Sequence, residues 1–220
     1  MKKKVAVILC GSGYLDGSEI RESVGVLWAL SQHNVDVQCF APDSLQSDVM
    51  NCLTGKPATA ESRNQLVESA RIARGKVLPL TQLKASEFDG LMMPGGFGAA
   101  KNLCNFAHAG SKGVVCAELL VVLEAIHAAK KPIGAVCIAP AILALAFKGE
   151  ALELTVGGQC EASQEIEKLG HRHVVCKASE CHVDSAHRVV TTPAYMHDQA
   201  PLHEIFTGIQ KLTQEVINLL

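Results

Sequence analysis

A single cysteine stands where an apolar segment meets a proline, in the sequence GAVCIAPA (134–141). Small residues, Ala135 and Ala139, lie two positions before and two after Cys137, as a nucleophile elbow requires at a strained turn between a strand and a helix. A thiol at a helix start is favoured as the thiolate, the form that attacks carbonyl carbon. The spacing predicts that Cys137 is a nucleophile, which an alkylating reagent labels ahead of the other eight cysteines. We interpret those eight as core cysteines with no chemical role.

Three glycines fall within four residues in the segment PGGFGAAKNL (94–103). A chain so rich in glycine can turn backbone N–H groups toward a ligand and let an anionic oxygen approach closely, as an oxyanion hole requires. The alternative is a tight turn with no ligand. Gly95 and Gly96 are therefore candidate donors to a developing oxyanion.

Two glutamates follow a glycine-containing loop in CGSGYLDGSEIRE (10–22). The loop begins like a dinucleotide-binding fingerprint, but Asp16 occupies the third glycine position, so the spacing argues against a nucleotide. Glu19 and Glu22 fall near the start of the next helix, where a carboxylate complements the helix dipole. For Glu19 we favour this capping role.

The elements that must position these loops are short apolar strands alternating with amphipathic helices. The strands are predicted at 5–9, 35–40, 76–80, 91–93 and 133–136, and later at 154–156, 173–176 and 189–191. The helices are predicted at 19–31, 62–74, 114–129, 138–147 and 201–219. Such alternation predicts an α/β fold with a mostly parallel sheet sandwiched between helices, flavodoxin-like in type. Sites in these folds lie at the carboxyl ends of the strands, where the three segments above would meet.

Composition narrows the class of protein. A chain of 220 residues with 48% hydrophobic residues fits one globular domain over 1–220. Its net charge of -2 makes nucleic acid and an anionic membrane poor partners. Nine cysteines without a CxxC pair indicate a reducing, intracellular compartment, either the cytoplasm or the mitochondrial matrix. The apolar run in the first ten residues is too short for a signal peptide or a membrane span.

A group of soft ligands occurs in HRHVVCKASECHVD (171–184), with three histidines and two cysteines. The spacings match no standard zinc site, and side chains that alternate along a strand point to opposite faces. We therefore predict no metal and no cofactor for this chain.

Six segments together resemble the ElbB-type branch, isoprenoid-biosynthesis or glyoxalase-like proteins, of the PfpI and Parkinson-associated deglycase superfamily. They are DGSEIRE, PGGFGAAKNL, GAVCIAPA, FAPD (40–43), ESRNQLVESARIARG (61–75) and VVTTPAYM (189–196). The resemblance spans nearly the whole chain and implies the class I glutamine amidotransferase-like fold and a homodimer. By this similarity Cys137 is the elbow thiol and Glu22 its hydrogen-bonding carboxyl, with Glu19 as the alternative one turn earlier. The resemblance also implies oxyanion or substrate contacts from a further set: Gly95, Gly96, Ile138, Thr192 and Pro193, the last two at the rim.

The chain departs from that superfamily in its histidines. One group carries a histidine directly after the cysteine, where this chain has Ile138, and another carries it about twenty residues later, where it has Gly157 and Gly158. Cys137 would then act with a carboxylate alone. The resemblance implies a small carbonyl metabolite as partner and conversion of methylglyoxal or another 2-oxoaldehyde to a hydroxy acid, and the missing histidine predicts that this activity is weak. The alternative is a non-catalytic protein that senses oxidants or binds a metabolite.

Overall fold

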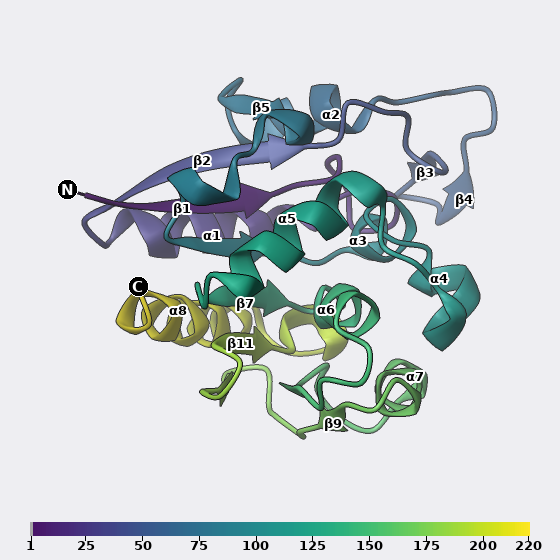
Figure 1. Cartoon of the computed structure of the whole chain (residues 1–220). Helices are drawn as coiled ribbons and strands as arrows, with labels where there is room; N and C mark the ends of the chain where they lie inside the picture. Colours follow the sequence, from purple (N-terminus) through teal and green to yellow (C-terminus); the bar gives the residue numbers. More distant parts are fainter. Residues whose placement is uncertain (1) are drawn as a thin grey trace.

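Seven strands form one twisted sheet in the computed structural model, which describes residues 2–220 (Figure 1). Their order across the sheet is β10-β11-β7-β6-β1-β2-β5. The strands are β1 Lys3–Ile8, β2 Val35–Ala41, β5 Val77–Pro79, β6 Gly90–Met93, β7 Ile133–Val136, β10 His182–Asp184 and β11 Val189–Thr192. Two small separate sheets pair β3 Met50–Asn51 with β4 Lys56–Pro57, and β8 Glu153–Leu154 with β9 Arg172–His173.

The sheet is parallel except for the pairing of β10 with β11 at one edge. This confirms the predicted fold class. Register then brings the candidate loops together: Met93 of β6 pairs with Ala135 of β7, and Val136 pairs with Thr192 of β11. Gly95 and Cys137 each lie two residues beyond a paired position, so their loops leave the sheet at the same level.

Helices cover both faces of the sheet, with α3, α5 and α6 on one side and α1 and α8 on the other (Figure 1). The helices are α1 Ile20–Ser31, α2 Gln65–Ile72, α3 Phe97–Lys101, α4 Phe106–Ala109, α5 Ala117–Ala128, α6 Pro140–Ala146, α7 Glu161–Lys168 and α8 Leu202–Asn218. Four 3-10 turns are η1 Leu80–Gln82, η2 Ala85–Glu87, η3 Gly110–Lys112 and η4 Ala194–Met196. No helix within residues 2–220 is both long and apolar enough to cross a membrane.

The central strand β1 shows how the sequence builds two cores. Ala6 and Ile8 belong to the hydrophobic cluster that α5 and α6 cover, whereas Val5 and Val7 belong to the cluster with α1 and α8. Successive side chains of a strand point to opposite faces, so a continuous apolar run feeds both clusters. Each fully buried Val or Ile side chain stabilises the fold by about 1.5–3 kcal/mol.

The region after the elbow differs from the sequence prediction. The strand expected at 173–176 ends at His173, and the run expected at 154–156 ends at Leu154. After Leu154, backbone N–H groups bond side chains instead of a neighbouring strand. The Thr155 N–H donates to the Thr191 hydroxyl, and the Val156 N–H donates to the His173 imidazole. The helix expected from 138 begins at Pro140, because residues 137–139 form the turn.

Candidate active site

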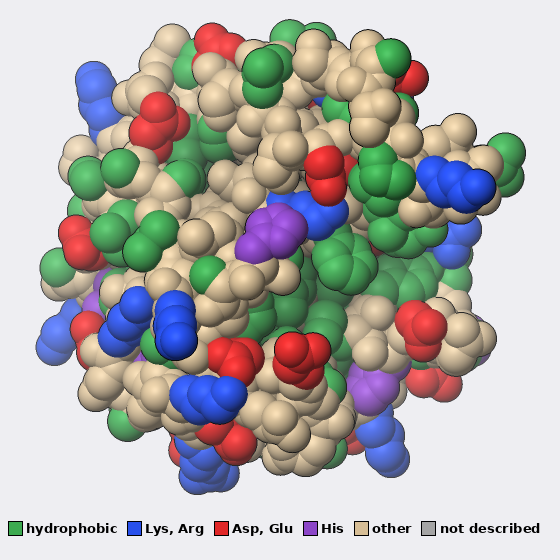
Figure 2. Space-filling model, turned by 90° about the vertical axis from the view of Figure 1, so that its right-hand side faces the viewer, with side chains coloured by type: hydrophobic (Ala, Val, Ile, Leu, Met, Phe, Trp, Pro, Cys, Tyr) green, Lys and Arg blue, Asp and Glu red, His purple; other side chains and the backbone are tan. Residues whose placement is uncertain are grey.

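Cys137 lies on a strained turn at the carboxyl edge of the sheet, the face seen in Figure 2. β7 ends one residue before it, and its φ of +62° falls in the left-handed region that residues with a side chain rarely adopt. The backbone N–H of Cys137 donates to the Thr192 carbonyl (2.9 Å), and Ala135 and Ala139 are fully buried beside it. The turn predicted from the alanine spacing is present, but only 7% of Cys137 is exposed.

The glycine loop after β6 lies directly against the elbow. A Cβ atom placed on Gly95 would come within 2.4 Å of the Cys137 Cβ and 2.8 Å of Glu22 Oε2. Gly96, with φ +96°, packs as closely on the backbone that precedes α1. Glycine is therefore needed here because three backbone segments meet where a side chain has no room.

Glu22, in the first turn of α1, is the carboxyl group beside the thiol. Its Oε2 accepts a hydrogen bond from the Gly95 N–H (2.9 Å) and its Oε1 accepts one from the Tyr195 N–H (3.2 Å). Glu19 is the residue that caps α1, where its carboxylate accepts a hydrogen bond from the Glu22 N–H (2.6 Å). Of the two glutamates left open by the sequence, the geometry places Glu22 next to Cys137 and gives Glu19 a capping role.

The Glu22 carboxyl is held largely in its protonated form at neutral pH. Burial, and then the nearby Glu19 carboxylate, raise the pKa of Glu22 to about 8. Hydrogen bonds from Tyr195, Cys137 and Gly95 to the charged form lower that pKa, but they do not offset the burial. A carboxyl with a pKa near the working pH is suited to proton transfer in both directions.

The predicted thiolate is not the resting state of Cys137. Burial, and then the charge of Glu22, raise the pKa of the thiol well above its ordinary value. The Gly96 and Ile138 backbone N–H groups favour the thiolate and lower the pKa of the thiol in part. Because two buried acids in contact repel each other once both are ionised, the pair carries at most one negative charge near neutral pH.

The donors available to an oxyanion differ from the predicted pair. The Gly95 N–H donates to Glu22 Oε2 in this structure (2.9 Å), so a role as oxyanion donor stays a prediction for Gly95. The Gly96 and Ile138 N–H groups instead favour the ionised form of the Cys137 sulfur and lower the pKa of its thiol. An oxygen bonded to the carbon that the sulfur attacks would lie near these two groups, so they are the candidate oxyanion donors.

Thr192 and Pro193 do not form a rim. Both are buried, and the Thr192 hydroxyl donates to the Glu180 carbonyl (2.7 Å) beneath the elbow. The Thr192 carbonyl holds the turn by accepting the Cys137 N–H, and the next segment, η4, brings the Tyr195 N–H to Glu22. Tyr195 carries no signal in the sequence, since it contributes a backbone N–H that any residue except proline has.

No histidine within residues 2–220 hydrogen-bonds Cys137 or Glu22. Gly157, where part of the superfamily has a histidine, adopts φ +96°, and a Cβ there would lie 3.0 Å from His197 Nε2. The His197 ring bonds the Cys176 carbonyl through Nε2 (2.9 Å). His197 thus fills the space beside Gly157 and leaves the thiol paired with a carboxyl alone.

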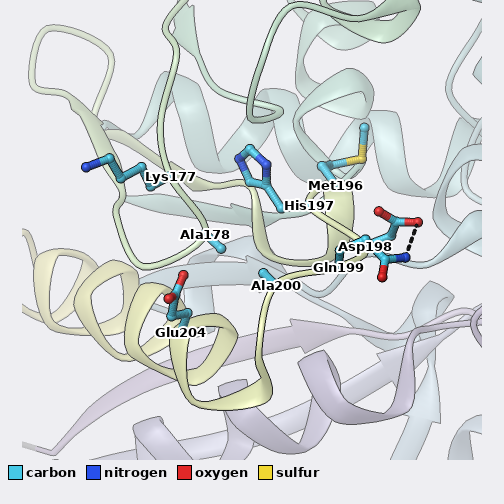
Figure 3. Close-up of a pocket in the computed structure, with 8 residues that line it drawn as sticks. All are labelled: Lys177, Ala178, Met196, His197, Asp198, Gln199, Ala200 and Glu204. Carbon is cyan, nitrogen blue, oxygen red and sulfur yellow. Dashed lines mark hydrogen bonds between the residues drawn. The ribbon is translucent and has the colours of Figure 1, made fainter.

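A cavity of about 440 Å³ opens beside η4 rather than over the thiol (Figure 3). It is lined by Lys177, Ala178, Met196, His197, Asp198, Gln199, Ala200 and Glu204. Neither Cys137 nor Glu22 contributes to it, so the assignment of the site rests on the geometry of the pair. Figure 2 shows hydrophobic side chains lining a hollow near the middle of the carboxyl face.

The histidine- and cysteine-rich segment does not converge on a point. Buried His171 bonds two backbone groups, at Leu152 and Ala144, while His182 pairs with Glu153 (2.8 Å). Within residues 2–220 no three His, Cys, Asp or Glu side chains are placed to hold a metal ion. Its histidines therefore serve local packing and ion pairing.

Burial changes the expected order of alkylation. Cys52 is exposed on the β3–β4 loop, whereas Cys137 is buried and its thiol pKa is raised. Since the rate follows exposure and thiolate fraction, we now expect substoichiometric iodoacetamide at pH 7 to label Cys52 before Cys137. Peptide mapping by mass spectrometry measures this order. Faster labelling of Cys137 would show that its thiol is ionised and reachable despite its burial.

Comparison with known proteins places the chain in a family, although no protein-family model matches it. It is 44% identical over 227 residues to the mitochondrial ES1 protein homolog of Rattus norvegicus, covering 99% of this chain and 84% of that protein. The chain belongs to the ES1 family. Its relative's mitochondrial name agrees with the compartments expected from the cysteines.

Solved structures connect the ES1 family to the predicted resemblance. An isoprenoid biosynthesis protein with an amidotransferase-like domain from Ehrlichia chaffeensis is 39% identical, with a TM-score of 0.91 over 99% of both chains. Drosophila melanogaster DJ-1beta, at 18% identity, has a TM-score of 0.55 over 99% of this chain and 97% of that one, and shares the fold alone. The ElbB-type resemblance and the amidotransferase-like fold are thus confirmed for this ES1 family member.

Proposed function

We propose that the protein is a cysteine-dependent enzyme of glyoxalase type that converts methylglyoxal or another 2-oxoaldehyde to the hydroxy acid. One observation carries the proposal: the fully buried Glu22 carboxyl lies beside the Cys137 thiol on a strained elbow, where burial raises the pKa of Glu22 to about 8. Perturbed acids held together at the carboxyl edge of an α/β sheet are typical of acid–base sites.

The first step is addition of the thiol to the aldehyde. With Glu22 as carboxylate, the Cys137 sulfur bonds the aldehyde carbon while its proton passes to Glu22. The new alkoxide is stabilised by the Gly96 and Ile138 N–H groups and then takes the proton back from Glu22. The product is a hemithioacetal, and Glu22 is again a carboxylate.

The second step moves a proton within the bound substrate. Glu22 removes the proton from the former aldehyde carbon, and the electron pair forms an enediolate with the neighbouring carbonyl. The hydroxyl proton on the sulfur-bearing carbon passes to the neighbouring oxygen, so the negative charge moves to the oxygen on the sulfur-bearing carbon. Glu22 returns the proton to that neighbouring carbon while the oxygen on the sulfur-bearing carbon becomes a carbonyl, which gives a hydroxyacyl thioester on Cys137. Water hydrolyses the thioester to the hydroxy acid and releases the thiol, so the overall change is addition of one water molecule.

The activity is expected to be weak. A well-placed general acid or base contributes roughly 10²- to 10⁴-fold, and a single carboxyl must serve here in every proton transfer.

Because the carboxylate form of Glu22 is required, kcat/KM is expected to rise with pH and to level off above pH 8. A rate that falls between pH 6 and pH 8 would contradict this assignment.

Steady-state formation of lactate from methylglyoxal tests the proposal. The wild type is expected to turn over slowly, and Cys137→Ala to show no activity above that of free buffer. Cys52→Ala, which removes an exposed thiol, is the matched control and should keep the wild-type rate. Equal turnover in Cys137→Ala would overturn the proposal.

The alternative is a non-catalytic protein that senses oxidants through Cys137 or binds a metabolite. The lack of a histidine at the pair and the closed surface over the thiol favour it. Absence of both lactate and any covalent adduct at Cys137 would move the assignment to this alternative. Homodimer formation stays a prediction from the family resemblance, which light scattering on the purified protein measures.

A further inference from the structure

The segment that follows β11 is held against Glu22 by a contact outside the reacting groups. Ala194 adopts φ +42°, a left-handed conformation that costs a residue with a Cβ on the order of 1 kcal/mol or more. This conformation aims the next N–H, that of Tyr195, at Glu22 Oε1 (3.2 Å). The Tyr195 hydroxyl accepts a hydrogen bond from Arg21 Nη1 (3.0 Å), the residue just before Glu22 in α1.

The two backbone bonds on Glu22 differ in how firmly they are held. Gly95 is fixed on both sides, since its carbonyl accepts from the Glu19 N–H (3.0 Å) and its Cα packs on the elbow. Tyr195 lies on a half-buried 3-10 turn, where its side chain contact to Arg21 bridges the turn to α1. The bond from Tyr195 is therefore the adjustable one of the two.

Few charged or titratable groups face the Glu22 carboxyl. They are Glu19 at the N-cap of α1 and Cys137 from the elbow, whereas η4 and the loop at Gly95 supply only the backbone N–H groups of Tyr195 and Gly95. The Tyr195 N–H favours the ionised form of the Glu22 carboxyl. Cys137 and Glu22 compete for the single negative charge of the pair. Loss of the Tyr195 bond would thus shift that charge toward the sulfur.

We propose that Tyr195, held by Arg21, is a positioning residue that orients the Glu22 carboxyl and determines how one negative charge is divided between Glu22 and Cys137. Tyr195 touches neither the sulfur nor the substrate carbon in this scheme and acts only through Glu22. The inference rests on the proposed function of the pair, but it concerns the protonation of the pair and not turnover.

The experiment measures the rate of Cys137 alkylation by iodoacetamide from pH 6 to pH 9, followed by peptide mapping. For Tyr195→Phe we expect no change below pH 7 and an increase of about three- to tenfold above pH 8, where wild-type Glu22 is ionised. Arg21→Gln should shift the profile in the same direction. Tyr14→Phe is the matched control. Tyr14 is the other tyrosine of the chain, and its hydroxyl donates to the Cys52 carbonyl and not to Arg21.

A double-mutant cycle distinguishes an effect that acts through Glu22 from a general loosening of the structure around Cys137. If Tyr195 acts through Glu22, Tyr195→Phe should have no effect on alkylation in a Glu22→Gln background. An increase at every pH, an increase that persists in the Glu22→Gln background, or no change at all would overturn the inference. A shifted profile in a protein that forms no lactate would support the inference while contradicting the proposed enzyme.

Discussion

The free energy of unfolding of Glu22→Gln, relative to that of the wild type, is expected to increase by about 2 to 4 kcal/mol as pH rises from 5 to 9. Burial raises the pKa of Glu22 in the folded protein to about 8, whereas an unperturbed glutamate in the unfolded chain has a pKa of 4.5. Between these values the folded protein keeps a proton that the unfolded chain releases. Ionisation therefore destabilises the wild type as pH rises through this window, and glutamine cannot ionise.

Urea unfolding at pH 5, 7 and 9 measures this effect. Glutamine also loses one backbone bond, because its amide nitrogen cannot accept from Gly95 or Tyr195, which costs about 1–3 kcal/mol at every pH. The difference in slope with pH, and not this constant offset, carries the test. The matched control is Glu124→Gln on the exposed side of α5, which should follow the wild-type curve. Parallel curves for wild type and Glu22→Gln would mean that Glu22 is ionised at pH 5.

Gly95→Ala is expected to lower the free energy of unfolding by about 3 kcal/mol or more. The new Cβ would lie 2.4 Å from the Cys137 Cβ and 2.8 Å from the Val136 carbonyl oxygen, neither of which can rotate away. The matched control is Gly158→Ala, where no atom lies within 4 Å of the added Cβ. That variant should be neutral, and thermal unfolding of both measures the contrast. A stable Gly95→Ala protein would mean that the loop has room to move off the elbow.

The sequence predicts the frame of the site better than its details. Apolar runs and their alternation predict the parallel sheet, and the alanines around Cys137 predict the turn, because both depend on local patterns. The ionisation of the thiol could not be predicted, since it depends on Glu22 and on burial produced by distant segments. The tertiary partners of the Gly95 N–H and the Thr192 hydroxyl, which are Glu22 and the Glu180 carbonyl, could not be predicted for the same reason.

Edge elements show the same limit. The strand expected at 173–176 is rich in valine, yet it stops at His173 because its partner β8 is only two residues long. β10 escapes prediction, since HVD has too few apolar residues to stand out and pairs only at the sheet edge. Tyr195 reaches Glu22 through a backbone N–H, so no residue type at that position reveals it.

Trapping of the acyl-enzyme tests the central claim most directly, that Cys137 and Glu22 carry out covalent carbonyl chemistry. Protein mixed with methylglyoxal is quenched with acid and treated with hydroxylamine, which converts a thioester to a hydroxamate. The account predicts lactohydroxamate from the wild type and from Cys52→Ala, little from Glu22→Gln, and none from Cys137→Ala. Equal amounts of hydroxamate from the wild type and from Cys137→Ala, or lactate formed by the wild type with no trapped thioester, would contradict it.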